Sequence, residues 1–344
     1  MAVGGRRLGA ALSVIRRRLV VPLAVGALVA VGGVVGGPAV GTAQAYSGSD
    51  FDPELIISDE LFYDSAAMTT QQIQDFLQAQ IGSCSNGLCL NVATVSSQSY
   101  ARSTSVSTGN VICEAVTGGT MPVSEWIYRV QVACGISAKV ILVTLQKEQG
   151  LTTSRAPSDV SLRYAMGMAC PDTAPCDTAF SGLATQIYAG VKQLKTYKAA
   201  RFAKQPGVQF IQYSPNAACG GTTINVRNYA TAALYSYTPY QPNAAALASL
   251  YGLGDACSAY GNRNFWVYYN EWFGPPSGGK GESAMVSLYE SLGGSAGPFG
   301  KSVGQSSCVL GSSVCISDYQ LGSIYWATGS AAWYALGATR DLYR

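Results

Sequence analysis

Glu148 is the side chain that the sequence best places for chemistry. The 344 residues include no histidine, so Ser-His-Asp triads, Cys-His pairs and histidine-bound zinc are excluded. Acid–base chemistry must come from Asp, Glu, Tyr, Lys or Cys. Glu148 continues the stripe of Ile141 and Leu145 along one face of a predicted helix and lies in its last turn. Apolar surroundings and the negative helix end both disfavour a carboxylate, which suits a general acid.

A purely structural role is the alternative for Glu148. Its carboxylate would then lie in water at the rim of the helix and pair with Lys147 or Arg155. The pattern alone leaves both roles open.

Helices are the elements that must position these side chains. The clearest one spans 138–149, where Ser137 is the N-terminal cap and Gly150 ends the helix. Other stretches also combine apolar periodicity with capping or stop residues, and a short hairpin is predicted around 210–213. Alternating strand patterns are few, so the predicted fold class is mainly α. The further predicted helices begin at Thr70 and span 124–134, 182–197 and 226–237.

Cysteines predict a scaffold of disulfides. All ten follow residue 45, and an even number of cysteines in an exported chain favours disulfides over metal ligands. No Cys-x-x-Cys pair is present, so neither a metal site nor a cofactor is expected. The neighbouring pairs predicted are Cys84–Cys89, Cys113–Cys134, Cys170–Cys176, Cys219–Cys257 and Cys308–Cys315.

The first 45 residues have the pattern of a secretory signal peptide. Five arginines without an acid precede a long apolar run, and Ala43-Gln44-Ala45 is typical of a cleavage site. An uncleaved membrane anchor is the alternative. The chain has a formal net charge of +3, but the 299 residues after Ala45 carry 17 basic and 19 acidic side chains, a net charge of −2. That part has no basic patch that could bind nucleic acid. The signal-peptide pattern predicts a secreted protein.

A Pro- and Gly-rich segment divides the remaining chain. Residues 274–284 begin with Gly274-Pro275-Pro276, and few of their side chains can pack. The predicted parts are a body over 46–273, this linker, and a tail over 285–344.

The sequence around Glu148 resembles the catalytic helix of the lysozyme-like superfamily, which includes lytic transglycosylases and goose-type lysozymes. The resemblance covers residues 135–151. In these enzymes the helix ends in a Glu-Ser-Gly-type turn, and the glutamate of that turn protonates the glycosidic oxygen. In this sequence Gln149 replaces the serine. Residues 164–170 resemble the family's small segment lining the cleft, and Gln186 lies in a stretch similar to its next helix. Residues 232–243 resemble the late segment whose tyrosine faces the glutamate. The resemblance implies a lysozyme-like body in which Glu148 is the acid.

Substrate contacts are also predicted. Many glycosidases use a second carboxylate, for which Asp172 and Asp177 are the nearest candidates. Ordinary turn roles are the alternative for both aspartates. Tyr237 and Tyr240 could stack on sugar rings or pack in the core, and Gln186 is the fifth predicted contact. Without a second acid, the resemblance implies a transglycosylase, in which a hydroxyl of the sugar attacks and a 1,6-anhydro product forms.

The tail resembles one LGFP repeat, a module thought to anchor exported actinobacterial proteins to the cell envelope. The matching stretches are 288–294, 297–300 and 321–331, although Lys301-Ser302 replace the usual proline. A small Gly-rich module is expected. The whole chain resembles secreted actinobacterial proteins labelled "hemagglutinin", a label that implies no mechanism.

These features predict a secreted, envelope-associated enzyme that cleaves peptidoglycan glycan strands, of muramidase or lytic transglycosylase type. Its expected partner is peptidoglycan or another envelope glycan. Binding to nucleic acid is not expected, and contact with a membrane is expected only through an uncleaved signal segment. The protein is predicted to be a monomer. The alternative is a non-catalytic wall-binding protein or adhesin on a lysozyme-like scaffold. An amidase or peptidase is a weaker third hypothesis, because the common zinc versions need histidine.

Overall fold

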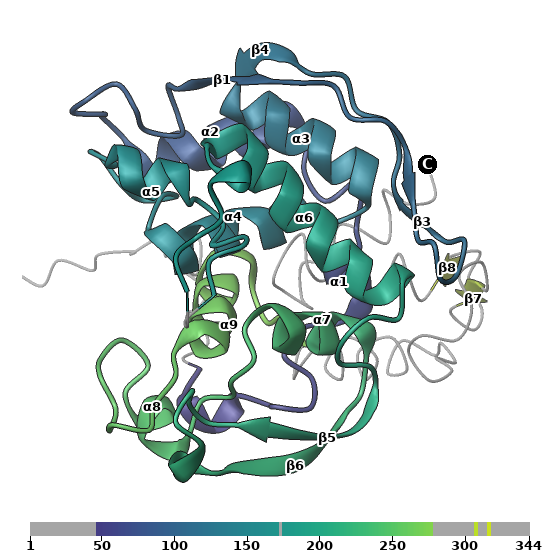
Figure 1. The fold of residues 1–344 in the computed structure, drawn as a ribbon, viewed down its shortest axis with the longest axis vertical. Coiled ribbons are helices and arrows are strands. Elements are labelled where there is room, and N and C mark those ends of the chain that lie inside the picture. The colour runs from purple at the N-terminus through teal and green to yellow at the C-terminus, as the bar shows by residue number, and fades with distance from the viewer. Residues whose placement is uncertain (1–45, 172–173, 278–305, 309–314, 318–344) are drawn as a thin grey trace, which may run out of the picture. The chain divides into compact units, whose positions relative to one another are not determined.

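The computed structural model describes residues 46–171 and 174–277, together with the backbone of two short strands at 306–308 and 315–317 (Figure 1). The predicted signal segment, Asp172 and most of the predicted tail lie outside the described residues.

The described part of the chain is mainly helical, as predicted. Its strands form antiparallel pairs, β1–β4, β2–β3, β5–β6 and β7–β8. The helices are α1 (Asp59–Phe62), α2 (Thr70–Ile81), α3 (Val123–Cys134), α4 (Ala138–Gln149), α5 (Asp159–Arg163), α6 (Leu183–Ala199), α7 (Tyr229–Tyr237), α8 (Ala244–Ala248) and α9 (Gly261–Phe273), with 3-10 turns η1 (Gly48–Asp50), η2 (Thr178–Phe180) and η3 (Ala217–Cys219). The strands are β1 (Thr94–Ser97), β2 (Ser103–Thr104), β3 (Val111–Cys113), β4 (Gly119–Pro122), β5 (Gly207–Gln212), β6 (Gly221–Val226), β7 (Ser306–Cys308) and β8 (Cys315–Ser317).

Helix α4 forms the centre of the core and has the predicted bounds. The Ser137 hydroxyl accepts a hydrogen bond from the Lys139 N–H at its start, and Gly150 ends it with a φ of 65°. Its residues from Val140 to Leu145 are buried. Helix α4 packs against α9 and α3, while α6 packs against α3 and α7. A helix buried on all sides can hold the groups at its ends rigidly.

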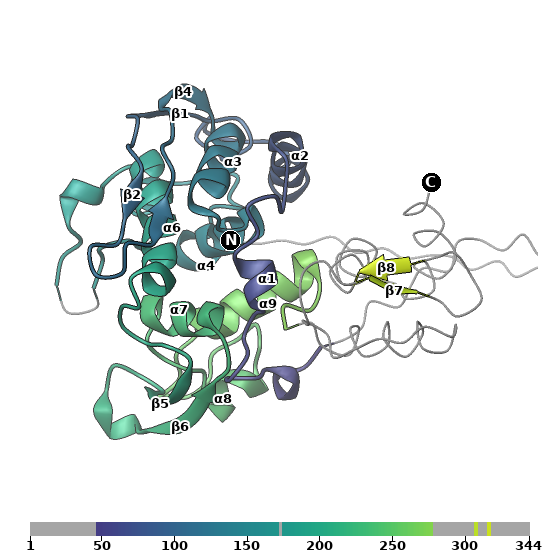
Figure 2. The same ribbon diagram turned by 90° about the vertical axis from the view of Figure 1, so that its right-hand side faces the viewer.

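The two-stranded pairs lie around this helical core. Figures 1 and 2 show β1–β4 at one end of the body and β5–β6 at the other. Strands β1, β3 and β4 contact α3, and β1 and β3 also contact α6. The predicted hairpin around 210–213 is confirmed and extends over all of β5 and β6, from Gly207 opposite Val226 to Gln212 opposite Gly221.

The helix predicted over 226–237 is wrong at its start. Val226 pairs with Gly207 as the last residue of β6. The Asn228 side chain then accepts a hydrogen bond from the Thr231 N–H and caps α7. At α2 the helix begins at Thr70 as predicted, but Thr69 is the cap. In both places the polar side chain of the residue just before the helix decides where the helix begins.

Helix α9 has no counterpart in the sequence pattern. It is rich in asparagine and aromatic residues, which are modest helix formers, and its N-cap Tyr260 makes no side-chain cap. Phe265, Trp266 and Tyr269 are nevertheless buried, because α9 packs along α4. Just beyond it, the buried Pro276 accepts a hydrogen bond from the Ser58 N–H at 2.9 Å, so the chain stays on the body to this point.

Four of the predicted disulfides are confirmed: Cys84–Cys89, Cys113–Cys134, Cys170–Cys176 and Cys219–Cys257. Cys308 and Cys315 are opposite each other in the β7–β8 register, and their side chains lie outside the described residues. Four disulfides in one chain are typical of an oxidising compartment.

Over the described ranges, no single helix is long and apolar enough to cross a membrane. Helices α3 and α4 meet that test only together, as a pair bent by 119°.

Candidate functional site

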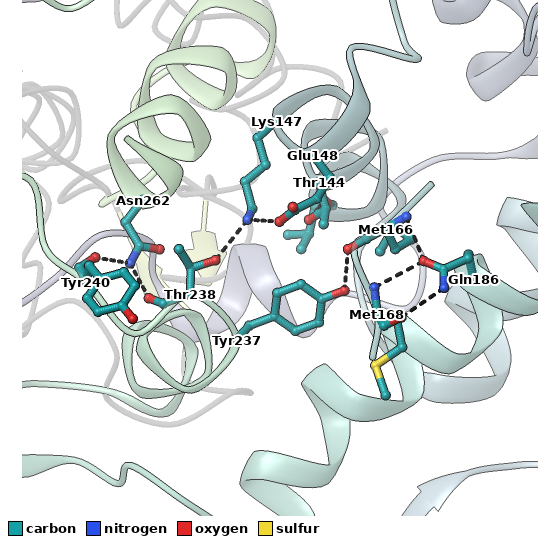
Figure 3. Close-up of polar contacts among 11 residues, drawn as sticks. Thr144, Lys147, Glu148, Met166, Met168, Gln186, Tyr237, Thr238, Tyr240 and Asn262 are labelled. Carbon is teal, nitrogen blue, oxygen red and sulfur yellow. Dashed lines mark hydrogen bonds and ion pairs between the residues drawn. The ribbon is translucent and has the colours of Figure 1, made fainter. Parts of the chain in front are cut away.

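Glu148 and Lys147 form an ion pair at the C-terminal end of α4 (Figure 3). The Glu148 side chain is 25% exposed, whereas the Lys147 side chain is only 2% exposed. The pairing with Lys147 that the structural interpretation predicted is therefore present. Its setting differs from that interpretation, because the lysine is buried and not at a solvated rim.

Lys147 is satisfied by groups from the segment that follows α7. Its ammonium donates a hydrogen bond to the Thr238 hydroxyl at 2.9 Å and lies 5.5 Å from the centroid of the Tyr237 ring. A buried charge is tolerated only where such partners replace water. The ammonium thus joins α4 to this segment and is also the ion-pair partner of the Glu148 carboxyl group.

Gly167 lies directly against the Glu148 carboxyl group. Its φ is 67°, and a Cβ added there would lie 2.7 Å from Glu148 Oε2. No other residue type fits that position without displacing the carboxyl or the backbone. The turn of residues 166–168 therefore forms one wall of the site, in the segment whose resemblance implied a cleft lining.

Gln186 holds this turn in place. Its side-chain oxygen accepts hydrogen bonds from the N–H groups of Met166 and Met168, both at 3.1 Å. Its side-chain nitrogen donates to the carbonyl oxygens of Met168 and Phe180 at 2.9 and 2.8 Å. Gln186 is completely buried, so it positions the backbone beside Glu148 and has no surface to offer a substrate.

Tyr237 closes the site from α7. Its hydroxyl donates a hydrogen bond to the Met166 carbonyl at 2.6 Å. A Cβ added to Gly190 would lie only 3.1 Å from the Tyr237 hydroxyl oxygen. Burial raises the pKa of Tyr237 well above its usual value, and the charge of Glu148 raises it further. The hydroxyl therefore remains a proton donor, and its partner is the turn that contacts Glu148.

Tyr240 lies apart from this group. Figure 3 shows its ring beyond Thr238 and Asn262, away from the Glu148 carboxyl. The side-chain nitrogen of Asn262 donates to the carbonyl oxygens of Thr238 and Tyr240, both at 2.8 Å. Asn262 thereby orients the segment that carries the partner of Lys147.

Asp177 has the turn role given as its alternative. Its exposed side chain caps η2 by accepting a hydrogen bond from the Ala179 N–H at 2.9 Å. Its own N–H donates to the Ala169 carbonyl, also at 2.9 Å. Asp172, its predicted companion, lies outside the described residues.

The sequence pattern did not predict the roles of three residues of the site. Gly167 contacts the Glu148 carboxyl group, Thr238 is the partner of Lys147, and Asn262 supports the segment of Thr238. Only the presence of Lys147 beside Glu148 could be seen in the sequence. Wherever residues are described, no group of three His, Cys, Asp or Glu side chains could hold a metal. The chemistry that this arrangement offers is proton transfer at a carboxyl group in contact with a buried amine.

Comparisons with known proteins add no family to this description. No family model, no curated protein and no solved structure matches the chain.

Proposed function

We propose that this protein is an exported enzyme that cleaves glycan strands of peptidoglycan, with Glu148 as its acid and base on a lysozyme-like body. The observation that supports it is the placement of Glu148. Its carboxyl group is partly exposed at the end of a buried helix, and Lys147 and the Gly167 turn contact it. Catalytic carboxyl groups need such a rigid setting together with access to substrate.

A reaction with one carboxylate fits the described residues best. Asp177 uses its side chain to cap its own turn. Glu148 would first protonate the glycosidic oxygen while the bond from that oxygen to the sugar carbon breaks. The C6 hydroxyl of the same sugar would then attack that carbon and give its proton to Glu148, which leaves a 1,6-anhydro end. This order returns the carboxyl to its starting state.

Lys147 has a proposed part in this cycle. A general acid must carry a proton when the glycosidic bond breaks, so each turnover needs a proton on the Glu148 carboxyl group. The ammonium is already in contact with the carboxylate, and it could supply that proton and take it back when the cycle closes. Thr238 and Tyr237 would hold the amine in place meanwhile.

The test is digestion of purified peptidoglycan by the protein and by Glu148→Gln. We expect release of muropeptides with anhydro ends, reduced by roughly a hundred- to ten-thousandfold in the variant. Glu114→Gln is the matched control, because Glu114 is also ion-paired, to Arg102, but is 58% exposed. Equal release by the wild type and Glu148→Gln contradicts the assignment, and reducing ends in place of anhydro ends contradict the one-carboxylate route.

A non-catalytic wall-binding protein is the second candidate. The ion pair favours it, because Lys147 already engages the carboxyl group that would act. Binding to insoluble peptidoglycan without release of any fragment supports this candidate.

In either case we propose that 1–45 directs secretion and that the tail, as an LGFP-type module, holds the protein at the envelope. Removal of 278–344 should then lower wall binding and leave the solution behaviour of the body unchanged.

A further inference from the structure

A cluster of lysine and tyrosine side chains lies at the other end of α4. We call it the Tyr63 cluster, and it consists of Asp59, Tyr63, Lys195, Lys198 and Tyr229. The Lys198 ammonium lies 4.0 Å from the centroid of the Tyr63 ring and 5.2 Å from that of Tyr229. The Lys195 ammonium lies 5.4 Å from the centroid of the same Tyr63 ring. Two cations thus share one aromatic ring.

The cluster has more positive than negative charge. Lys198 pairs with Asp59 only at 3.4 Å, and the other oxygen of Asp59 accepts a hydrogen bond from the Ala230 N–H at 2.7 Å. Lys195 has no hydrogen-bond or ion-pair acceptor among the residues that the structure describes. Two ammonium groups therefore face one carboxylate that is already partly used.

An unused hydrogen-bonding group completes the cluster. The Tyr63 hydroxyl is buried and has no hydrogen-bond partner in the described part of the chain. Such groups are rare in folded proteins because each costs the free energy of its lost hydration. Stacking on an aromatic ring only partly offsets the burial of an ammonium. Burial indeed lowers the pKa of Lys195, and repulsion from Lys198 lowers it further.

The Tyr63 cluster is separate from Glu148. Phe62, next to Tyr63, accepts a hydrogen bond through its carbonyl from the N–H of Ser137, the cap at the start of α4. Glu148 lies at the far end of that helix, roughly 18 Å away for 12 residues. A ligand at the cluster would not occupy the Glu148 site.

We infer that the Tyr63 cluster binds an oxyanion, a phosphate or carboxylate group, between the Lys195 and Lys198 ammonium groups, with the Tyr63 hydroxyl as a further donor. Such a group supplies the missing negative charge and accepts from all three donors. A peptide-stem carboxylate or a phosphodiester of an envelope polymer presents this chemistry. The inference does not depend on catalysis at Glu148.

The test uses the chain without 1–45, with inorganic phosphate and acetate as separate probes. Both are titrated while the lysine side-chain methylene signals are followed by NMR. We expect saturable shifts of the Lys195 and Lys198 signals, stronger with whichever anion the cluster prefers. Lys195→Met should weaken binding about tenfold and Tyr63→Phe less, because a charged donor contributes more than a neutral one. Lys192→Met, on the same helix, is the control and should bind like the wild type.

Stability without ligand separates this role from a structural one. Lys195→Met should melt at the same or a higher temperature than the wild type in the absence of anions, because it removes an unpaired buried charge. Shifts that do not saturate, or equal binding by Lys195→Met, would mean an adventitious ion only and overturn the inference. A large loss of melting temperature in ligand-free Lys195→Met would also overturn it.

Discussion

Lys147 in the last turn of α4 and Lys195 of α6, which lies near the start of α4, are in opposite circumstances. At the C-terminal end, Lys147 is almost fully buried and meets a carboxylate, a hydroxyl and an aromatic ring. At the N-terminal end, the half-buried Lys195 meets an aromatic ring and, in the described structure, no acceptor. Burial by itself therefore does not say what a lysine does. Its partners decide whether the charge stabilises the fold or remains available to a ligand.

The largest expected effect tests how rigidly the Glu148 end is built. Gln186→Leu removes the partner of three backbone groups in the 166–168 turn and of the Phe180 carbonyl in η2, so we expect a loss of about 4 kcal/mol in the free energy of unfolding. Urea denaturation measures it. Gln71→Leu is the control and should change little, because Gln71 is exposed on α2 and its side chain donates only to the exposed Asp75. A loss of similar size in both variants would mean that the Gln186 network does not support the site.

Gly167→Ala should cost about 2 to 3 kcal/mol, because a left-handed backbone disfavours a side chain and the new Cβ must displace the Glu148 carboxyl. Gly150→Ala provides the matched comparison. Its φ of 65° is almost the same, but nothing lies within 4 Å of the added Cβ, so only about 1 to 2 kcal/mol of strain is expected. Denaturation gives the difference between the two. Peptidoglycan release should fall only in Gly167→Ala, and equal behaviour contradicts the contact.

Opposite signs at the two lysines are the direct test of the comparison. Lys147→Met leaves the Glu148 carboxylate without its counter-ion. We expect a loss of about 2 kcal/mol in the free energy of unfolding. This is less than the loss on breaking a fully buried ion pair, because the Glu148 side chain is 25% exposed. Lys195→Met should be neutral or stabilising. Both are measured by denaturation at pH 7, and a loss at both positions would remove the distinction between the two ends of α4.

The smallest expected effect is a dependence of stability on pH. Burial lowers the pKa of Lys195 and Lys139 in the folded protein, with Lys198 adding repulsion at Lys195 and Asp64 opposing the shift at Lys139. The unfolded chain then binds more protons, so the free energy of unfolding should rise with pH below the usual lysine pKa of about 10.4.

The measurement of this slope stays between about pH 8 and 9.5. Above it, buried tyrosines such as Tyr235, whose pKa is raised by burial, lose protons on unfolding and reverse the trend. Lys195→Met should flatten the slope, and Lys192→Met should not. A slope unchanged by Lys195→Met would show that the amine is not held in the unpaired state described above.

Local signals in the sequence predicted much of the core. Ser137 and Gly150 define α4, because a hydroxyl cap and a left-handed glycine act within one turn of the helix. Pairing each cysteine with its neighbour in the sequence predicted four disulfides, of which Cys84–Cys89 and Cys170–Cys176 close short loops and Cys113–Cys134 and Cys219–Cys257 longer ones. The strands β1 and β4 were not predictable, because they are short, largely polar and paired across more than twenty residues.

The candidate site was predictable in part. The pattern indicates Glu148, and resemblance adds Gln186 and Tyr237. The structure brings these together through the 166–168 turn, to which both Gln186 and Tyr237 are hydrogen-bonded, and through Lys147, which contacts Glu148 and the Tyr237 ring. Tyr240 lies apart from this group, and Asp177 has the turn role that its residue type offered as the alternative.

The sequence by itself determined the mainly helical body, the ends of its central helix and the chemical type of its candidate acid. Capping, helix periodicity and the absence of histidine are all local or compositional properties. Only the tertiary structure decided that Lys147 is buried against Thr238, 91 residues away, whereas Lys195 stacks on Tyr63 without an acceptor in the described part of the chain. The partners of a charge come from distant segments, and the free energy of a buried charge depends on those partners far more than on its neighbours in the chain.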